Sequence, residues 1–210
     1  TEAYLPGDPR ARGVLYLPFR DAEECRRLVA QYAERPGVVG VFVTTAGFLP
    51  LHDNRYVPLY AELQERGLPL CFHPTSLWRE RPFELFDRYL PVYALGRPFY
   101  QCAQVINWVL HGLPERFPRL PCVFLEAGVS WLSFVAHRLD QEFLKRPSEA
   151  PLLRDRPSHY IARYFYGTQP LEQGPHDYLE SAMKVVGYDH LLYASNFPEA
   201  DFDLPGVVER

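Results

Sequence analysis

Residues 69–73 (PLCFH) decide the fold, because they form a short apolar run that begins at a proline and ends at His73, directly before Pro74. Five further runs share this character, being rich in β-branched or aromatic residues and bounded by glycine or proline: 13–17 (GVLYL), 38–44 (VVGVFVT), 122–126 (CVFLE), 164–167 (YFYG) and 190–195 (HLLYAS). Runs that are continuously apolar and do not alternate predict strands buried on both faces.

Amphipathic patterns lie between these runs and predict helices at 21–34, 56–66, 99–117, 131–144 and 177–186. Asp21, with Glu24 three residues later, is typical of a capped helix start. The alternation of strand and helix predicts parallel strands joined by right-handed crossovers, in either a barrel or a doubly wound sheet. No glycine-rich phosphate-binding motif follows a strand, which argues against a nucleotide-binding version.

The composition favours one α/β domain over residues 1–210, since no repeat or flexible linker divides the chain. The formal net charge is −4 without a long basic run, so we expect no nucleic-acid partner. No apolar window is long enough for a membrane span and the first 20 residues lack a signal-peptide pattern, so we expect no membrane partner and a cytoplasmic location. The four cysteines form no CxxC pair, and we expect buried reduced thiols.

The carboxyl ends of the strands are where α/β folds place their active sites. His73 and Glu126 both end an apolar strand, and Asn196 follows the last one. A histidine at such a position is either a metal ligand or a structural residue. A carboxylate there is either a general acid or base, or half of a buried ion pair. The irregular stretch 76–97 after the third strand is either a pocket wall or lid, or a surface excursion.

Several segments together resemble the amidohydrolase-related family, whose members include aminocarboxymuconate-semialdehyde decarboxylase and gamma-resorcylate decarboxylase. The resemblance rests on LEAGVSW (125–131) with HRLD (137–140), and on YASNFPEADFD (193–203). Supporting matches cover nearly the whole chain: 50–60 (PLHDNRYVPLY), 68–74 (LPLCFHP), 116–120 (RFPRL) and 145–160. The resemblance implies a metal-dependent (β/α)8 TIM barrel, commonly with zinc and often dimeric, acting on a carboxylated aromatic or similar planar acid.

The chain departs from the family pattern in three ways. The six strands read as strands three to eight, without the HxH or ExH pair of the first strand, and we expect the first one or two strands to be absent from this sequence. Asn196 stands where the family has the aspartate of the eighth strand, and an amide neither takes up a proton nor supplies negative charge to a metal. This difference is consistent with an engineered change, with a natural loss of metal or with a site reworked around Glu199. Glu126 stands at the sixth-strand position, in the LEAG context of one branch of the family.

The resulting assignments follow the resemblance. His73 corresponds to the fifth-strand metal ligand, and Glu126 and Asn196 are the catalytic candidates. The substrate-binding candidates are Trp78, Trp131, Arg138 and Glu199. For Trp131 the alternative is a core position, and for Arg138 it is an ion pair with Asp140 or a nearby acid. A divalent metal, zinc, is expected if the first-strand ligands exist, and no cofactor otherwise.

The predicted function is decarboxylation of a small carboxylated aromatic or cyclic substrate by a homodimer. Hydrolysis of an ester, lactone or amide is the alternative from the same family. The third hypothesis is a catalytically silent member that binds a ligand or a partner, suggested by Asn196, Glu199 and the missing first-strand ligands.

Overall fold

A computed structural model describes residues 8–44, 50–75, 81–172 and 177–198. All six predicted strands are present: β1 (Gly13–Tyr16), β2 (Val38–Thr44), β3 (Leu70–His73), β4 (Cys122–Phe124), β5 (Phe165–Gly167) and β6 (Leu191–Leu192). They form one sheet in the order β1-β2-β3-β4-β5-β6, and every neighbouring pair is parallel. The α/β class and the parallel sheet are therefore confirmed.

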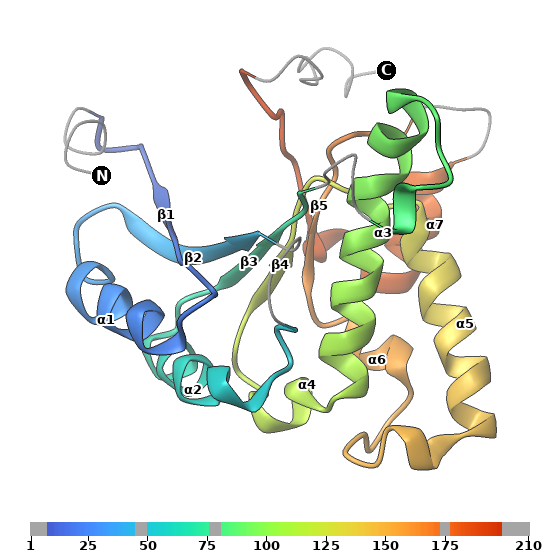
Figure 1. The fold of residues 1–210 in the computed structure, drawn as a ribbon, viewed down its shortest axis with the longest axis horizontal. Coiled ribbons are helices and arrows are strands. Elements are labelled where there is room, and N and C mark those ends of the chain that lie inside the picture. The colour runs from blue at the N-terminus through green and yellow to red at the C-terminus, as the bar shows by residue number, and fades with distance from the viewer. Residues whose placement is uncertain (1–7, 45–49, 76–80, 173–176, 199–210) are drawn as a thin grey trace.

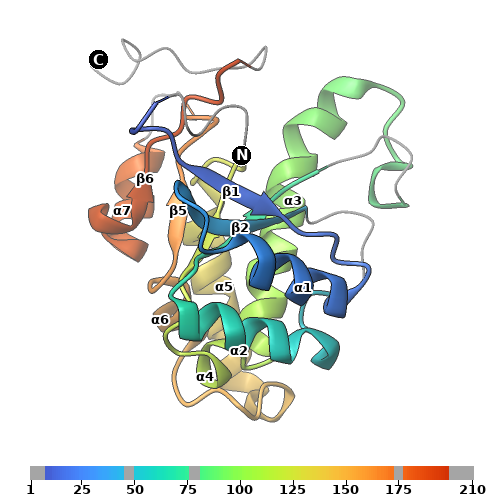
Figure 2. The same cartoon turned by 90° about the vertical axis from the view of Figure 1, so that its left-hand side faces the viewer.

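The helices lie along one side of the curved sheet (Figures 1 and 2). They are α1 (Ala22–Tyr32), α2 (Val57–Arg66), α3 (Tyr89–Leu110), α4 (Leu113–Arg116), α5 (Trp131–Lys145), α6 (Pro157–Ile161) and α7 (Tyr178–Val186). Short 3₁₀ turns occur at η2 (Asn54–Tyr56), η3 (Arg81–Phe83), η4 (Pro147–Glu149) and η5 (Tyr188–His190). Asp21 caps α1 as predicted, since its carboxylate accepts from the backbone N–H groups of Glu23 and Glu24.

The boundaries predicted for the third helix were wrong. Helix α3 begins at Tyr89, ten residues before the predicted start, and ends at Leu110, after which α4 forms a separate turn. The predicted helix began directly after Pro98, whereas Pro98 lies inside α3. The last part of the stretch that we expected to be irregular, 89–97, is therefore helical and extends the helix above the sheet (Figure 1).

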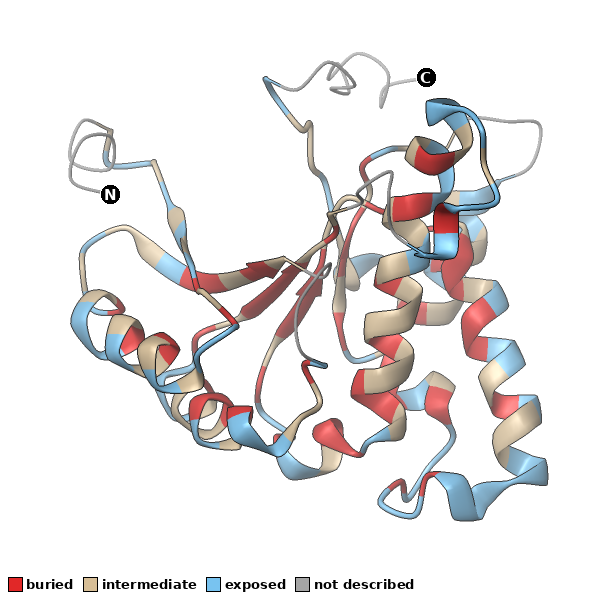
Figure 3. Cartoon of the chain, viewed as in Figure 1, coloured by how far each residue is buried: buried red, intermediate tan, exposed pale blue. Residues whose placement is uncertain are grey.

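Strand β1 is partly buried on one face and exposed on the other, in contrast to the burial on both faces that was predicted for its apolar run. Val14 and Tyr16 are 43% and 49% exposed, whereas Leu15 between them packs against the core. β1 is at the edge of the sheet, with α1 on one side, and its residues alternate between partly buried and exposed (Figure 3). A continuous apolar run therefore did not distinguish this edge strand from the central strands.

An aromatic stack crosses the central strands and aligns their carboxyl ends. Phe72 on β3 stacks on Phe124 on β4 with ring centroids 4.6 Å apart, and Phe124 stacks on Tyr166 on β5 at 5.5 Å. These three residues are partners in the parallel register. His73 directly follows Phe72 at this level of the sheet, and Glu126 lies two residues beyond Phe124, after the end of β4.

The four cysteines are free thiols, as predicted. Cys25, Cys71 and Cys122 are also buried as predicted, whereas Cys102 is only partly buried. Within the described ranges, every helix is too short or too polar to cross a bilayer.

Candidate active site

His73 and Glu126 meet at the carboxyl edge of the sheet. Nε2 of His73 lies 3.0 Å from Oε1 of Glu126. On the other side of the ring, Nδ1 lies 3.1 Å from the carbonyl oxygen of Pro74. Phe42, on β2, packs edge-on against the imidazole at 5.6 Å. The ring is therefore fixed by contacts on both nitrogens and on one face.

The two contacts of the imidazole restrict how it can share a proton. A carbonyl oxygen only accepts hydrogen bonds, so the contact with Pro74 favours the tautomer with a proton on Nδ1 of His73. At 3.0 Å, a proton on either Nε2 of His73 or Oε1 of Glu126 forms a hydrogen bond to the other atom and can pass between them. The pair is thus arranged to hold and transfer a single proton.

Backbone strain occurs at both predicted catalytic residues. Glu126 has φ +53° and Asn196 has φ +58°, and among the described residues they are the two non-glycine positions with positive φ. Left-handed backbone costs roughly 1–2 kcal/mol for a residue with a side chain, and asparagine tolerates it better than glutamate does. Strain of this kind is concentrated at functional sites. Asn196 follows β6, which lies two strands beyond β4 in the sheet order.

Arg97 is a site residue that the sequence analysis missed. Its Nη1 lies 3.7 Å from Oε2 of Glu126, and its guanidinium carbon lies 4.9 Å from the ring centroid of Tyr93, one helical turn earlier on α3. The side chain of Arg97 is only 19% exposed. The predicted helix start at residue 99 left Arg97 in a loop, where nothing connected it with Glu126. A helix continuous through Pro98 would have placed Tyr93 and Arg97 on one face.

Gln101, on the next turn of α3, lies beneath the pair and was also missed. Its side chain is fully buried, and its Nε2 donates to the carbonyl oxygens of Phe72 at 2.6 Å and Leu125 at 2.8 Å. A polar residue in an otherwise apolar helix face was the available signal in the sequence.

The remaining candidates do not join this cluster among the described residues. Trp131 is buried, and its Nε1 donates to the carbonyl oxygen of Gly128. Arg138 is exposed on α5 and pairs with Glu142 at 3.1 Å. Asp140 instead accepts from the backbone N–H and the hydroxyl of Ser158, at the start of α6. Trp78 and Glu199 lie outside the described residues.

Glu172 supports the loop that follows Glu126. Its carboxylate accepts from the backbone N–H groups of Val129 and Ser130, at 3.2 and 3.3 Å, and from the Ser130 hydroxyl at 2.7 Å. These groups directly precede α5, where a negative charge is favourable. Gly128 lets the carboxylate approach, because a Cβ at this position would lie 2.1 Å from Oε1 of Glu172.

The described residues do not form a complete metal site. No group of three or more histidine, cysteine, aspartate or glutamate side chains is suitably placed within them. His73 and Glu126 offer two donors, whereas catalytic zinc takes about three protein ligands and an open position. The positive charge of Arg97 beside Glu126 further disfavours a cation there.

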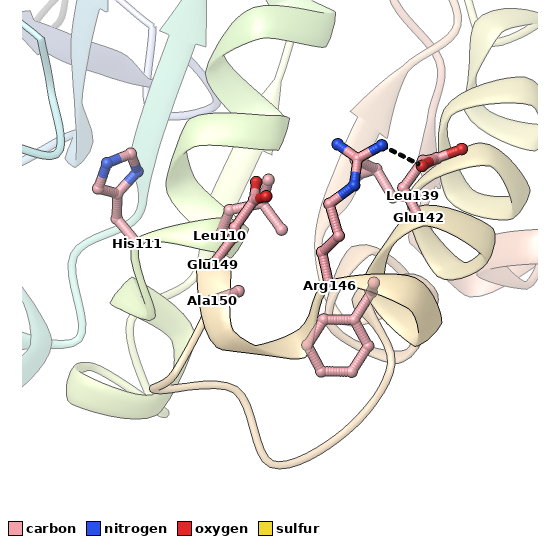
Figure 4. Close-up of a pocket in the computed structure, with 8 residues that line it drawn as sticks. Leu110, His111, Leu139, Glu142, Arg146, Glu149 and Ala150 are labelled. Atoms are coloured by element: carbon pink, nitrogen blue, oxygen red, sulfur yellow. Dashed lines mark hydrogen bonds and ion pairs between the residues drawn. The ribbon is translucent and has the colours of Figure 1, made fainter.

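Two cavities lie away from this edge, around the C-terminal end of α3. One of about 200 Å³ is lined by apolar residues of α3 and α5 and by a charged rim (Figure 4). On that rim Glu142 already pairs with Lys145 and Arg146, both at 3.2 Å, and Lys145 contributes most to lowering the pKa of Glu142. The second, of about 430 Å³, is lined partly by His52 and His111, whose rings stack with centroids 3.6 Å apart. Neither cavity includes His73 or Glu126.

Comparison with solved structures establishes the class of fold. The chain is similar to 5-carboxyvanillate decarboxylase from Sphingomonas paucimobilis, with 23% identity, a TM-score of 0.79 and coverage of 92% of this chain and 58% of that one. It is similar to 2,6-dihydroxybenzoate decarboxylase from Rhizobium, with 18% identity, a TM-score of 0.77 and coverage of 92% and 62%. A third match is dihydroxybenzoic acid decarboxylase from Polaromonas sp. JS666, solved with manganese and 2-nitroresorcinol, with 19% identity, a TM-score of 0.77 and coverage of 98% and 64%.

The architecture is thus that of the amidohydrolase-type TIM barrels, of which this chain spans less than two thirds of the length. The model of the Amidohydrolase family matches residues 2–205, and the chain belongs to that family. The resemblance inferred from LEAGVSW and the segments that accompany it is confirmed.

Proposed function

We propose that this chain is a decarboxylase of a small carboxylated aromatic acid, in which His73 and Glu126 supply the proton that replaces the carboxylate. The observation that carries this proposal is the 3.0 Å contact between the two side chains, with the guanidinium of Arg97 at the second oxygen of Glu126. The similar structures named as decarboxylases of aromatic acids support the choice of substrate class.

The reaction needs one proton donor and a means of orienting an acid. Arg97 binds an oxygen of the substrate and orients the carboxylate, as guanidinium groups do through paired hydrogen bonds. The proton shared by His73 and Glu126 passes to the ring carbon that carries the carboxylate. The bond between that carbon and the carboxylate then breaks, its electrons return to the ring, and carbon dioxide leaves. A proton from water restores the pair.

Asn196 completes the proposal as a hydrogen-bonding residue. Its amide both donates and accepts, so it suits a substrate hydroxyl or a water better than a proton transfer. Its strained backbone, at the same edge of the sheet as Glu126, supports this role. Trp78 and Glu199 remain predicted substrate contacts. For Trp131 and Arg138, the hydrogen bond to Gly128 and the ion pair with Glu142 support structural roles.

The metal, the oligomeric state and the location are finer parts of the proposal. The family resemblance suggests zinc and the Polaromonas structure holds manganese. Within the described residues, His73 and Glu126 would supply two of the roughly three protein ligands that such an ion takes, and the assay with added zinc or manganese tests for the ion. The resemblance supports a homodimer, which sedimentation velocity tests. The composition supports a cytoplasmic location, which fractionation of the source cells tests.

The experiment is carbon dioxide release from 2,6-dihydroxybenzoate and 5-carboxyvanillate, with and without added zinc or manganese. We expect turnover by the wild type, loss of it in Glu126→Gln, and a raised KM in Arg97→Met. Arg35→Met is the matched control, since Arg35 lies 4.5 Å over the ring of Tyr32 and repeats the arginine–tyrosine contact away from the site. Binding of these acids without any release would reject the decarboxylase in favour of a silent ligand-binding member. Turnover that survives Glu126→Gln would reject the assigned proton donor.

A further inference from the structure

Gln101 makes two hydrogen bonds whose direction is unambiguous. Its side chain is fully buried on α3, and both of its partners are carbonyl oxygens, those of Phe72 and Leu125. Because a carbonyl only accepts, the group that faces them is the NH₂ of the amide, and each of its two hydrogens has one partner. No isosteric side chain other than an amide supplies two such donors from one atom.

The two carbonyls occupy corresponding places beside the candidate active site. Phe72 directly precedes His73, and Leu125 directly precedes Glu126. The backbone N–H of Leu125 also donates to the carbonyl of Phe72 at 3.0 Å, which continues the β3–β4 ladder one residue beyond β4. Gln101 therefore links the two segments through the carbonyl groups that directly precede His73 and Glu126.

Glu126 needs such support because of its backbone. At φ +53° it leaves the strand direction abruptly, and this turn aims its carboxylate at His73. A left-handed glutamate persists only where its surroundings hold it. The bond from Gln101 to Leu125 holds the peptide that immediately precedes this turn.

The amide of Gln101 also carries a cost, which a purely structural residue at this place would avoid. Its Oε1 is buried and has no hydrogen-bond partner among the described residues. A buried polar atom without a partner is destabilising, and an apolar side chain of the same shape would remove that penalty.

We propose that Gln101 is a positioning residue, which sets the separation of His73 and Glu126 by tying together the peptides that precede them. It touches neither the substrate nor the proton that is transferred. The contact between the pair is a property of the folded chain and is tested without substrate. The kinetic part of the test rests on the proposed function.

The test compares Gln101→Met, which keeps the shape and removes both donors, with Tyr164→Phe. The control removes the buried hydrogen bond from Nε1 of Trp108 to the hydroxyl of Tyr164. Trp108 is also on α3 but lies away from the carboxyl edge of the sheet. Nitrogen-15 NMR on histidine-labelled protein follows the proton between His73 and Glu126. We expect this proton to exchange with water at least about tenfold faster in Gln101→Met and to be unchanged in Tyr164→Phe. Equal exchange in Gln101→Met and the wild type, or equal acceleration in both variants, would overturn the proposal.

A second measurement, on the wild type, tests the proposal in case the Gln101→Met variant does not fold. In the wild type, both side-chain N–H protons of Gln101 are expected to exchange at least about 100-fold more slowly than those of an exposed glutamine. Rapid exchange of either proton would contradict the two bonds and overturn the proposal. If the wild type decarboxylates, Gln101→Met should lower kcat about 10- to 100-fold and leave KM within about twofold. If the protein does not decarboxylate these acids, the two exchange measurements still test the positioning role of Gln101, because neither needs a substrate.

Discussion

The imidazole of His73 and the carboxylate of Glu126 lie 3.0 Å apart, because His73 ends β3 and Glu126 turns out of the segment that follows the neighbouring strand β4. Phe72 and Phe124 are paired across the two strands. His73 directly follows Phe72, whereas Glu126 lies two residues after Phe124 and has left-handed backbone. The sheet therefore converts two separate strand ends into one proton-sharing pair, and most of the chemistry proposed here depends on that pair.

Because one proton is shared, the two residues should behave as a unit. We expect His73→Asn and Glu126→Gln each to lower the rate of decarboxylation about 100-fold or more. The double variant should lose little beyond either single variant, since both remove the same proton donor. Initial rates at saturating substrate for the four proteins measure this coupling. Fully multiplicative losses would show that the residues act independently.

Gly128 should be far less replaceable than Gly67, although both have positive φ, of +60° and +65°. Gly67 has open space around it, so Gly67→Ala should cost only the backbone strain, about 1 kcal/mol. Gly128→Ala should cost about 2–4 kcal/mol, because the new methyl group also displaces the Glu172 carboxylate from its N–H partners. Urea unfolding measures both changes. In a Glu172→Ala background the two glycine substitutions should become similar, and a persistent gap would contradict this explanation.

His52 should make the protein less stable in mild acid. Burial, followed by the neighbouring His111, lowers the pKa of His52 below its usual 6.5. The unfolded chain therefore takes up this proton more readily, so the full stability is present above about pH 6.5 and declines as the pH falls through the lowered pKa. Asp53 opposes the shift weakly, and Arg116 lines the same cavity.

The measurement for His52 is the urea midpoint between about pH 7 and about pH 5. His52→Asn should flatten this dependence, whereas His137→Asn, at an exposed histidine on α5, should leave it as steep as in the wild type. A His52→Asn protein with an unchanged slope would assign the acid sensitivity to other groups.

The cysteines should be unreactive in the folded protein. Burial raises the pKa of Cys25 and Cys102 to about 12 and that of Cys71 to about 11, and it raises the pKa of Cys122 well above the usual value. Thiolate is the reactive form, so at about pH 8 labelling by a disulfide reagent should be at least 100-fold slower than in urea, where all four thiols react. A thiol that labels rapidly in the native protein would identify an opening that exposes it.

The sequence by itself predicted the existence of the six strands, their parallel arrangement and the family. Short apolar runs bounded by proline and glycine favour strands, because their length and flanks leave too few residues for a buried helix. It also pointed to His73, Glu126 and Asn196, because a polar residue that ends a buried strand stands at the edge where such folds bind their ligands.

Only the tertiary structure decided which other side chains reach that edge. Arg97 and Gln101 belong to the site because α3 runs through Pro98 and packs against β3 and the segment after β4. Tertiary packing here outweighs the local tendency of proline to interrupt a helix. Arg138 pairs with Glu142, since residues four apart share a helix face and those two apart do not. His52 and His111 stack although no spacing in the sequence relates them. Contacts between residues distant in the chain depend on the path of the backbone, which local sequence patterns do not specify.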